Sequence, residues 1–347
     1  MQKNIYANDK TVLKDAIPLE VPFCVSIEPT NICNFKCRMC FHGNIETDPK
    51  AKPLKNMDIV VFEKTLADLK DWVLKTQTKI KLIKLYSLGE PLLNKEICNM
   101  VKAIKEADVC NKIEITTNGS LLTEDVAKKL IDYGLDILRI SVYSVYKDRF
   151  KFVTQSDIEY DLIYKNVKFA KEYRDSNNGM TKIYAKMLDT NSPENDEFIE
   201  KYKDVVDEVG IDEVFQIGIG DGVDVFENLF GEKADEAHNK SLNTNVINNE
   251  TRRPCRYPFT HLTVRNDGSV IVCCSDWLKE LCVGNIQNNT LEEIWKSRSL
   301  YELRCDMLKT KGFKWEVCRN CEIPFRDSVE DDVSGVEIEK LSYANDI

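Results

Sequence analysis

Hydrophobic and polar positions follow two alternating periods along the first 220 residues of the chain. Short runs rich in β-branched and aromatic residues are each followed by a stretch whose apolar residues recur every three or four positions. The first pattern is typical of buried strands, and the second is typical of helices that pack on one face. The strand-like runs lie at 23–30, 80–87, 112–117, 135–144, 182–188 and 213–219.

Five helices are expected between these strands. In the first, Asp58 is a suitable N-cap for the apolar positions that run from Phe62 to Trp72. The last begins at Ser192 and Pro193 and should end at Gly210. The intervening helices are marked by Ile97, Val101 and Ile104, by Thr123 with Glu124 and Asp125, and by Tyr160, Ile163, Val167 and Ala170.

Six strands that alternate with five helices predict an α/β fold, in which a parallel sheet is covered by helices. Because about 200 residues are too few for an eight-stranded barrel of ~250 residues, we expect a partial (β/α)6 TIM-type barrel over residues 20–220. In such folds the chemistry lies at the carboxyl ends of the strands.

The pattern changes after this region. Residues 221–254 are polar and aperiodic, which predicts a linker that crosses the molecule. The run HLTVRNDGSVIVCC (261–274) predicts a hairpin that turns at 266–269, within a small α+β domain over 255–325. The acidic residues 326–347 are expected to form a tail or a docking strand.

Composition narrows the class of protein. The 347 residues are 43% hydrophobic and carry a net charge of −10, which argues against a nucleic-acid surface. No apolar run is long enough to span a membrane, and residues 1–20 lack the apolar core of a secretory signal. We therefore expect a cytoplasmic protein, whose thirteen cysteines act as metal ligands and core thiols rather than as disulfides.

Three of these cysteines follow the first strand in the run CNFKCRMC, at Cys33, Cys37 and Cys40. Three thiolates can hold three irons of a [4Fe–4S] cluster and leave the fourth iron open. The alternatives are a zinc site completed by His42, or unrelated core cysteines. The arrangement resembles the radical S-adenosylmethionine (SAM) superfamily. That resemblance implies that SAM binds the open iron, and that one electron from an external flavodoxin or ferredoxin cleaves it to methionine and a 5′-deoxyadenosyl radical.

The resemblance extends to the ends of the later strands. LGEPLL (88–93) is similar to the family's GE motif, which implies that Gly89 and Glu90 bind the SAM amino group. Asn118 in TTNGSLLT is a candidate contact at the same edge, and Ser141 is a candidate for the SAM ribose or carboxylate. Lys186 could reach the carboxylate, and residues 215–220 would support the adenine. An ordinary turn, a plain strand serine and a surface lysine are the simpler interpretations of these positions.

A second set of cysteines lies near the C-terminus. Cys255 and Cys273 flank the hairpin, and Cys318 and Cys321 form a CxxC pair. Four thiolates can close around a second [4Fe–4S] cluster with no open iron, although a structural zinc ion would use the same four. The region resembles the twitch domain, a short form of the SPASM domain, which implies an auxiliary cluster. Cys24, Cys98 and Cys110 are expected to be buried in the core.

A radical SAM barrel with a twitch domain resembles aminocyclitol and sugar-alcohol dehydrogenases. It implies oxidation of an alcohol in a small polar substrate, such as a sugar, aminocyclitol or nucleotide sugar, with the auxiliary cluster as electron acceptor. Lys186 and Tyr143 are candidate bases, and Tyr86 and Gln216 lie at the same rim.

Three alternatives stay open. Cys274 could donate a hydrogen atom, which would make the enzyme an epimerase, or it could be a packing residue whose side chain points away from that of Cys273. Maturation of a precursor peptide would need a separate leader-binding protein, because only about 20 residues precede the first strand. A non-enzymatic iron–sulfur or zinc scaffold would have no need of Glu90 or Ser141.

Overall fold

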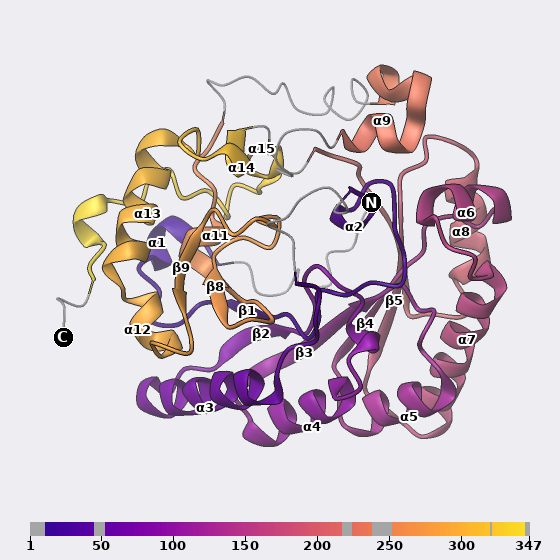
Figure 1. Ribbon diagram of the computed structural model, residues 1–347, viewed down its shortest axis with the longest axis horizontal. Helices are drawn as coiled ribbons and strands as arrows, with labels where there is room; N and C mark the ends of the chain where they lie inside the picture. The colour runs from indigo at the N-terminus through magenta and orange to yellow at the C-terminus, as the bar shows by residue number, and fades with distance from the viewer. Residues whose placement is uncertain (1–10, 45–52, 217–223, 238–251, 320, 344–347) are drawn as a thin grey trace.

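One curved sheet organises the protein (Figure 1). The computed structural model describes residues 11–44, 53–216, 224–237, 252–319 and 321–343. In this part of the chain the strand order is β6-β5-β4-β3-β2-β1-β7-β8-β9. The strands are β1 (Cys24–Ile27), β2 (Ile80–Lys84), β3 (Cys110–Thr117), β4 (Ile137–Ser141), β5 (Lys182–Leu188), β6 (Glu208–Asp212), β7 (His261–Val264), β8 (Ser269–Ile271) and β9 (Cys282–Asn285).

Strands β1 to β6 are parallel, and helices cover their outer face (Figure 1). Alternate strand residues such as Ile83 and Ile115 point outward into the core beneath these helices and are fully buried. The expected partial TIM-type barrel is confirmed. The longer helices are α3 (Ile59–Thr76), α4 (Ile97–Ala107), α5 (Glu124–Asp132), α6 (Lys147–Thr154), α7 (Tyr160–Ser176), α8 (Glu194–Tyr202) and α13 (Arg298–Thr310).

The sixth strand was placed wrongly by the hydrophobic pattern. Helix α8 ends at Tyr202, so β6 lies at Glu208–Asp212 rather than at 213–219. Gly210 does not end a helix. It lies inside β6, where a Cβ atom would collide with the Tyr184 hydroxyl of the neighbouring strand β5. A close approach between two strands therefore accounts for this glycine. Residues 217–220, which were expected to support the adenine, lie outside the described residues.

The helices that were not foreseen include two near the first cysteine loop, α6 and α9. Helix α6 follows β4, ahead of the expected helix α7. Within the expected linker, α9 (Val225–Phe230) and η4 (Gly231–Lys233) form a small apolar cluster in which Phe226 and Leu229 are buried. Met39 and Tyr143 pack against this cluster, so α9 covers part of the cysteine loop.

The C-terminal hairpin continues the barrel sheet. Strand β7 pairs in parallel with β1, and the predicted turn at 266–269 joins it to β8. At the carboxyl ends of β1 and β7, the fully buried Glu28 carboxylate pairs with the Arg265 Nε at 3.0 Å and also accepts a hydrogen bond from the Leu88 N–H. The predicted capping box from Thr290 to Glu293 begins α12 (Leu291–Trp295).

The C-terminal residues are not a free tail. Val333, Val336 and Leu341 form a second apolar cluster with Leu13 of α1 (Leu13–Ala16) and with Phe259. The Leu13 N–H donates to the Glu330 carbonyl at 2.8 Å, which ties the two ends of the described chain together. The remaining short elements are α2 (Phe41–Asn44), η3 (Pro91–Leu93), α11 (Tyr257–Thr260), α14 (Glu316–Arg319), α15 (Ile323–Arg326) and η5 (Ile338–Lys340).

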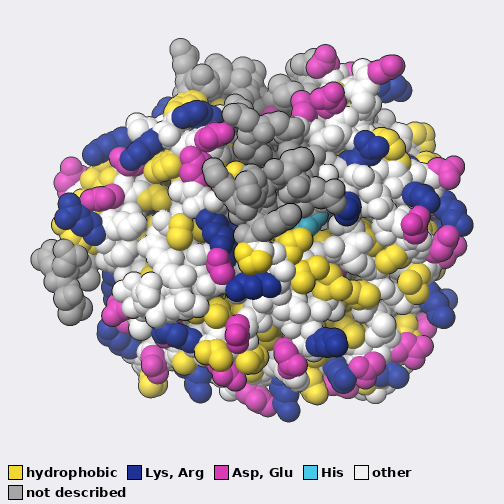
Figure 2. Space-filling view, viewed as in Figure 1, with side chains coloured by type: hydrophobic (Ala, Val, Ile, Leu, Met, Phe, Trp, Pro, Cys, Tyr) yellow, Lys and Arg dark blue, Asp and Glu magenta, His cyan; other side chains and the backbone are white. Residues whose placement is uncertain are grey.

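Several expectations concern the whole molecule. The thirteen cysteines are all free, and all lie in the described residues. Cys24 and Cys98 are buried as expected, whereas Cys110 is only half-buried. No helix in the described part of the chain is long and apolar enough to cross a membrane. On the face seen in Figure 2, acidic and basic side chains are interspersed. The domain boundaries given above stay predictions.

Candidate functional site

The first cysteine loop begins just after β1, at the carboxyl edge of the sheet. Cys37 is buried, and Cys33 and Cys40 are half-buried. The three thiols are close enough for their charges to raise one another's pKa, but burial is the largest cause and raises the pKa of Cys33 to about 12. The donor set consists of sulfur alone, which suits an iron–sulfur cluster that binds thiolates and displaces their protons.

Side-chain amides fix this loop to the end of β3. Asn34 donates to the Ser120 hydroxyl at 2.9 Å, and Asn118 donates to the Asn34 side-chain oxygen at 2.9 Å. The Ser120 hydroxyl in turn donates to Asn118 at 2.6 Å, which closes the network. Asn118 therefore acts as a structural support of the loop. Asn34 and Ser120 carried no signal that would have marked them in the sequence.

The unforeseen helix α6 holds the loop from the other side. The N–H groups of Lys36 and Arg38 donate to carbonyl groups of Thr154 and Val153 at 3.0 and 2.9 Å. The fully buried Phe35 ring lies 5.9 Å from the Tyr143 ring and 6.0 Å from the Phe150 ring, in both cases edge to face. The loop is therefore anchored along its whole length by polar and aromatic contacts.

Gly89 and Glu90 lie against the base of the loop, as the GE motif predicts for a common site. A Cβ atom on Gly89 would come within 2.5 Å of the Ile32 carbonyl oxygen, so only glycine fits. The Glu90 carboxylate accepts hydrogen bonds from the Thr117 hydroxyl, the Asn118 N–H and the Leu92 N–H. Burial raises the pKa of Glu90 to about 7 despite these three donors.

A cavity of about 170 Å³ opens beside the cysteine loop. It is lined by Cys37, Cys40, Ser141, Tyr143 and Lys186, so the structure brings together five of the residues singled out in the sequence. Tyr143 and Cys37 line this cavity together, and the charges of the three loop cysteines act on the Tyr143 hydroxyl. Tyr143 and Lys186 therefore lie beside the cysteines, as expected for groups that contact a cofactor. The remaining lining residues are Met39, Val142, Met187, Leu188 and Asp212.

Asp212 was missed by the sequence analysis because the sixth strand was misplaced. It is the last residue of β6, and its carboxylate pairs with the Lys186 Nζ at 2.8 Å. The parallel register of β4, β5 and β6 puts Ser141, Lys186 and Gly210 side by side. Asp212 lies two residues beyond Gly210 along β6, so its side chain is on the same face of the sheet. Lys186 is thus held at the cavity by an ion pair.

The four cysteines near the C-terminus also lie close together. Cys255, Cys273, Cys318 and Cys321 line one narrow apolar cavity, together with Met307 and Val317. In the described residues, no three His, Cys, Asp or Glu side chains are placed to hold a single metal ion. Thiols alone, gathered from the hairpin and the CxxC pair, fit the donor set of a cluster in which each sulfur binds a different iron.

Arg252 lies among these four cysteines and was not foreseen. Its side chain is 3% exposed, and it donates to the Lys311, Cys318 and Cys321 carbonyl groups at 2.8, 2.5 and 3.2 Å. The charges that act on it are those of Cys255, Cys318 and Cys321. The described residues thus place a buried cation against the thiol set.

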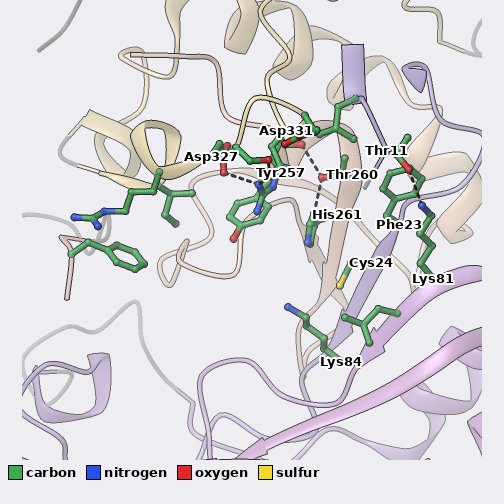
Figure 3. A pocket seen from close by; sticks show the side chains of 18 residues that line it. Thr11, Phe23, Cys24, Lys81, Lys84, Tyr257, Thr260, His261, Asp327 and Asp331 are labelled. Carbon is green, nitrogen blue, oxygen red and sulfur yellow. Dashed lines mark hydrogen bonds and ion pairs between the residues drawn. The ribbon is translucent and has the colours of Figure 1, made fainter. Parts of the chain in front are cut away.

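A large cavity, of about 560 Å³, lies between the sheet and the C-terminal region (Figure 3). Cys24 and Lys84 reach it from the inner face of the barrel, and in Figure 3 Lys84 points toward Tyr257 and His261. On the opposite wall, Arg256 pairs with Asp327 and Asp331 at 2.7 and 2.6 Å. Burial raises the pKa of Asp327 to about 6, which Arg256 partly offsets.

This large cavity adjoins the four-cysteine cavity, because Tyr257 and Ile323 line both. A row of inward-facing polar residues leads from it along the barrel toward Ser141 and Lys186. The Tyr86 hydroxyl donates to the fully buried Glu114 at 2.5 Å, Arg139 lies 3.6 Å from the same carboxylate, and the Arg139 guanidinium lies over the Tyr184 ring. The interior of the barrel is therefore polar between the two cysteine sites.

Cys274 does not lie in the extended strand on which the expected direction of its side chain rested. Strand β8 ends at Ile271, and Cys273 begins a turn in which its carbonyl accepts from the Asp276 N–H at 3.2 Å. The charge of the Cys274 thiol acts on that of Cys273. Cys274 is nonetheless exposed, and its charge acts on Cys24 and Tyr257, which line the large cavity.

Comparison with known proteins decides between the metal-site alternatives. Residues 27–185 match the radical SAM superfamily, and residues 255–322 match the SPASM iron–sulfur cluster-binding domain. The chain contains a radical SAM domain and a SPASM domain. These two domains indicate SAM and two [4Fe–4S] clusters as cofactors. Zinc at the two cysteine sites is thereby set aside.

Among curated relatives, a probable GTP 3′,8-cyclase of Metallosphaera sedula is 29% identical over 194 residues, 55% of each chain. A tungsten-containing aldehyde ferredoxin oxidoreductase cofactor-modifying protein of Pyrococcus furiosus is 30% identical over 116 residues, 33% of this chain and 29% of that protein. The chain thus matches about half or less of the length of these relatives.

Solved structures share the fold over most of the chain. BtrN in complex with AdoMet and 2-DOIA has a TM-score of 0.53 at 16% identity, covering 87% of this chain and 93% of BtrN. SuiB of Streptococcus suis, bound to S-adenosylmethionine, has a TM-score of 0.59 at 17% identity and covers 84% of this chain and 70% of SuiB. Native anSMEcpe with bound AdoMet has a TM-score of 0.57 at 16% identity, covering 92% of this chain and 95% of anSMEcpe.

Proposed function

We propose that this radical SAM enzyme is an oxidoreductase that oxidises an alcohol of a small polar substrate, such as a sugar, aminocyclitol or nucleotide-sugar derivative. The observation that carries the proposal is the cavity of about 560 Å³ that shares Tyr257 and Ile323 with the four-cysteine cavity. A substrate there would lie beside a cluster able to accept an electron. The BtrN structure, whose fold is similar, is described with AdoMet and 2-DOIA bound.

The site residues divide between the cofactors. Cys33, Cys37 and Cys40 would hold the SAM cluster, and Cys255, Cys273, Cys318 and Cys321 would hold the auxiliary cluster. When bound, the first cluster supplies the electron that generates a 5′-deoxyadenosyl radical from SAM, and the second supplies an electron acceptor. Gly89, Glu90, Ser141 and Lys186 would bind SAM, with Asn118 supporting Glu90 and the loop. An external flavodoxin or ferredoxin would deliver the electrons.

Two of the candidate bases from the sequence are better suited to holding SAM than to taking a proton. Lys186 is bound to Asp212, and burial raises the pKa of Tyr143 well above its usual range. Tyr143 therefore keeps its proton at neutral pH. Both groups can donate hydrogen bonds to a carboxylate, which is what the SAM site requires.

His261 is the better candidate for the base. Thr260 donates its hydroxyl proton to the Arg256 carbonyl at 2.9 Å, so His261 Nδ1 must donate to the Thr260 oxygen at 2.8 Å. The lone pair of a neutral imidazole is then on Nε2. Burial, with Lys84 and Arg256 nearby, lowers the pKa of His261 well below its usual range, which keeps the ring neutral.

The proposed reaction then balances. His261 would take the hydroxyl proton of the substrate. SAM would supply the radical that removes one hydrogen atom from the carbinol carbon, and the auxiliary cluster would supply the acceptor for the remaining electron as the C=O bond forms. The charged wall of Arg256, Asp327 and Asp331, opposite Lys84, suits a substrate with several polar groups.

The test is anaerobic turnover of the reconstituted enzyme in D₂O with panels of sugars, aminated polyols, nucleotide sugars and GTP. We expect a product lighter by two hydrogens, with one 5′-deoxyadenosine per product and no solvent deuterium at the reacting carbon. His261→Gln should lower the rate of product formation without lowering SAM binding. A cyclised nucleotide or a modified peptide as the only product would overturn the proposal.

A second candidate, epimerisation, is favoured by one observation. Cys274 is exposed, whereas a packing residue would be covered, and its charge acts on Cys24 and Tyr257, which line the large cavity. A thiol can return a hydrogen atom to a carbon radical because its S–H bond is weak. In D₂O an epimerase would give a product of substrate mass plus one non-exchangeable deuterium, and Cys274→Ala would abolish that product. Loss of two hydrogens would rule epimerisation out.

A further inference from the structure

The surroundings of Arg252 set it apart from the other buried arginines. Arg174, Arg256 and Arg265 each pair with carboxylates. Arg252, by contrast, is 3% exposed, and among the described residues its hydrogen-bond acceptors are backbone carbonyl groups. A buried cation without a counter-anion is costly. Arg252 lines the four-cysteine cavity, and the charges that act on it are those of Cys255, Cys318 and Cys321, which would be thiolates when they hold a cluster.

The hydrogen bonds point the guanidinium toward the ligand loop. Its Nη2 donates to the Cys318 carbonyl at 2.5 Å, and its Nη1 donates to the Cys321 and Arg319 carbonyls at 3.2 and 3.4 Å. Its Nε donates to Lys311 at 2.8 Å. Of five N–H groups, one on Nη2 has no acceptor among the described residues. Beyond fixing the CxxC turn, Arg252 can therefore donate to a sulfur of a bound cluster.

The other faces of Arg252 are apolar. The Phe313 and Phe325 rings lie 4.9 and 5.5 Å from the guanidinium carbon, and Met307 and Val317 complete the cavity wall. Little water can screen the charge in such surroundings, so its effect on a neighbouring charge is larger than at a surface. The reduced form of a cluster carries one more negative charge than the oxidised form, and a buried cation favours it.

We propose that Arg252 is a positioning residue that raises the reduction potential of the auxiliary cluster and so makes that cluster the better electron acceptor. The proposal deepens the proposed function, since it explains why an electron would pass from a substrate radical to this cluster. It requires only that the cluster is bound, and it is tested without substrate, so a failure of alcohol oxidation would leave the result standing.

The experiment uses the full chain with Cys33, Cys37 and Cys40 replaced by Ala, so that only the auxiliary cluster is present. Its midpoint potential is measured by redox titration followed by electron paramagnetic resonance. Arg252→Gln should shift the equilibrium at least tenfold toward the oxidised cluster, which is 59 mV for a one-electron couple. Arg252→Lys, which keeps the charge, should stay within about threefold of the parent.

A matched control is Arg304→Gln. Arg304 is 7% exposed and also donates to carbonyl groups, those of Pro258 and Trp295, but Cys305 is the only cysteine whose charge acts on it. This variant should leave the potential unchanged. Iron content separates charge from mere support of the loop. If the Arg252→Lys variant keeps its iron and the Arg252→Gln variant loses it, the result favours the proposal. Iron lost by both, or an unchanged potential in an iron-loaded Arg252→Gln, would overturn it.

Discussion

The two cysteine sites of this protein differ in how their thiols are brought together and in what surrounds them. In the first, three thiols lie within eight consecutive residues, and the loop that bears them is held by amides and aromatic rings on one side of an open cavity. In the second, four thiols from residues 255–321 line one narrow cavity together with the buried Arg252. Under the proposed assignment, the first site would leave one iron open to a ligand, and the second would leave none open. This difference predicts which substitutions act on chemistry and which act on electron transfer.

The largest effect should come from removing one ligand of the open site. Cys37→Ala should abolish reductive SAM cleavage, because a loop with two thiols cannot hold the cluster. The measurement is 5′-deoxyadenosine released with dithionite as reductant. Cys305→Ala, which removes a buried free thiol outside both sites, is the control and should keep full cleavage. Cleavage by Cys37→Ala at more than a few per cent of the parent rate would contradict the ligand assignment.

Removing one ligand of the closed site should separate two activities. Cys318→Ala should still cleave SAM, uncoupled from product, because the first site is untouched. Its iron content should fall by about half, and product should be lost. Cys282→Ala, an exposed thiol in β9 outside the four-cysteine cavity, is the matched control. Wild-type product formation by Cys318→Ala would mean that the auxiliary cluster takes no part in the reaction.

A third substitution tests the link between the sites. Arg265→Leu leaves the fully buried Glu28 carboxylate without its ion-pair partner, and we expect a loss of about 3–5 kcal/mol in the free energy of unfolding. Chemical denaturation of the apoprotein measures it. Replacing both partners, as in Glu28→Leu with Arg265→Leu, should restore part of that stability. A loss below about 1 kcal/mol in the single variant would show that the pair is not a structural tie.

The smallest expected effect concerns Glu90 and pH. Its folded pKa of about 7 is raised above the ordinary value of 4.5, so the folded protein binds the proton more tightly than the unfolded chain does. Stability should therefore fall as pH rises from about 4.5 to 7 and then level off, by on the order of 2–3 kcal/mol for this group. Glu90→Gln should flatten that part of the profile and weaken SAM binding, as isothermal titration can show. An unchanged profile would contradict the raised pKa.

The sequence predicted the first site far better than the second. Three cysteines in eight residues follow one strand, and the family resemblance pointed to residues at the ends of later strands, of which Ser141 and Lys186 line one cavity with Cys37 and Cys40. The four auxiliary cysteines were found by resemblance, and their surroundings were not foreseen. Arg252 belongs to no motif, because its function depends on carbonyl groups that come within reach only through folding.

Errors in the strand positions had a physical origin. Gly210 follows a run of helix-like apolar spacing, and only the position of the Tyr184 hydroxyl reveals why a glycine is required there. The misplacement hid Asp212, the partner of Lys186. His261 escaped notice for a different reason. Its suitability as a base depends on the proton of Thr260, a local hydrogen bond that no sequence pattern records.

The pairing of β1 with β7 has a consequence for how the protein is made. The strand that leads into the first cysteine loop lies between β2 and β7, and its residue Cys24 pairs with His261. A ribosome must therefore synthesise more than two thirds of the chain before β1 gains its second neighbour, and until then that edge is open to wrong partners. Loading of the SAM cluster and completion of the C-terminal region are thereby linked in time. Truncation before the hairpin should yield a protein that aggregates before it can hold iron.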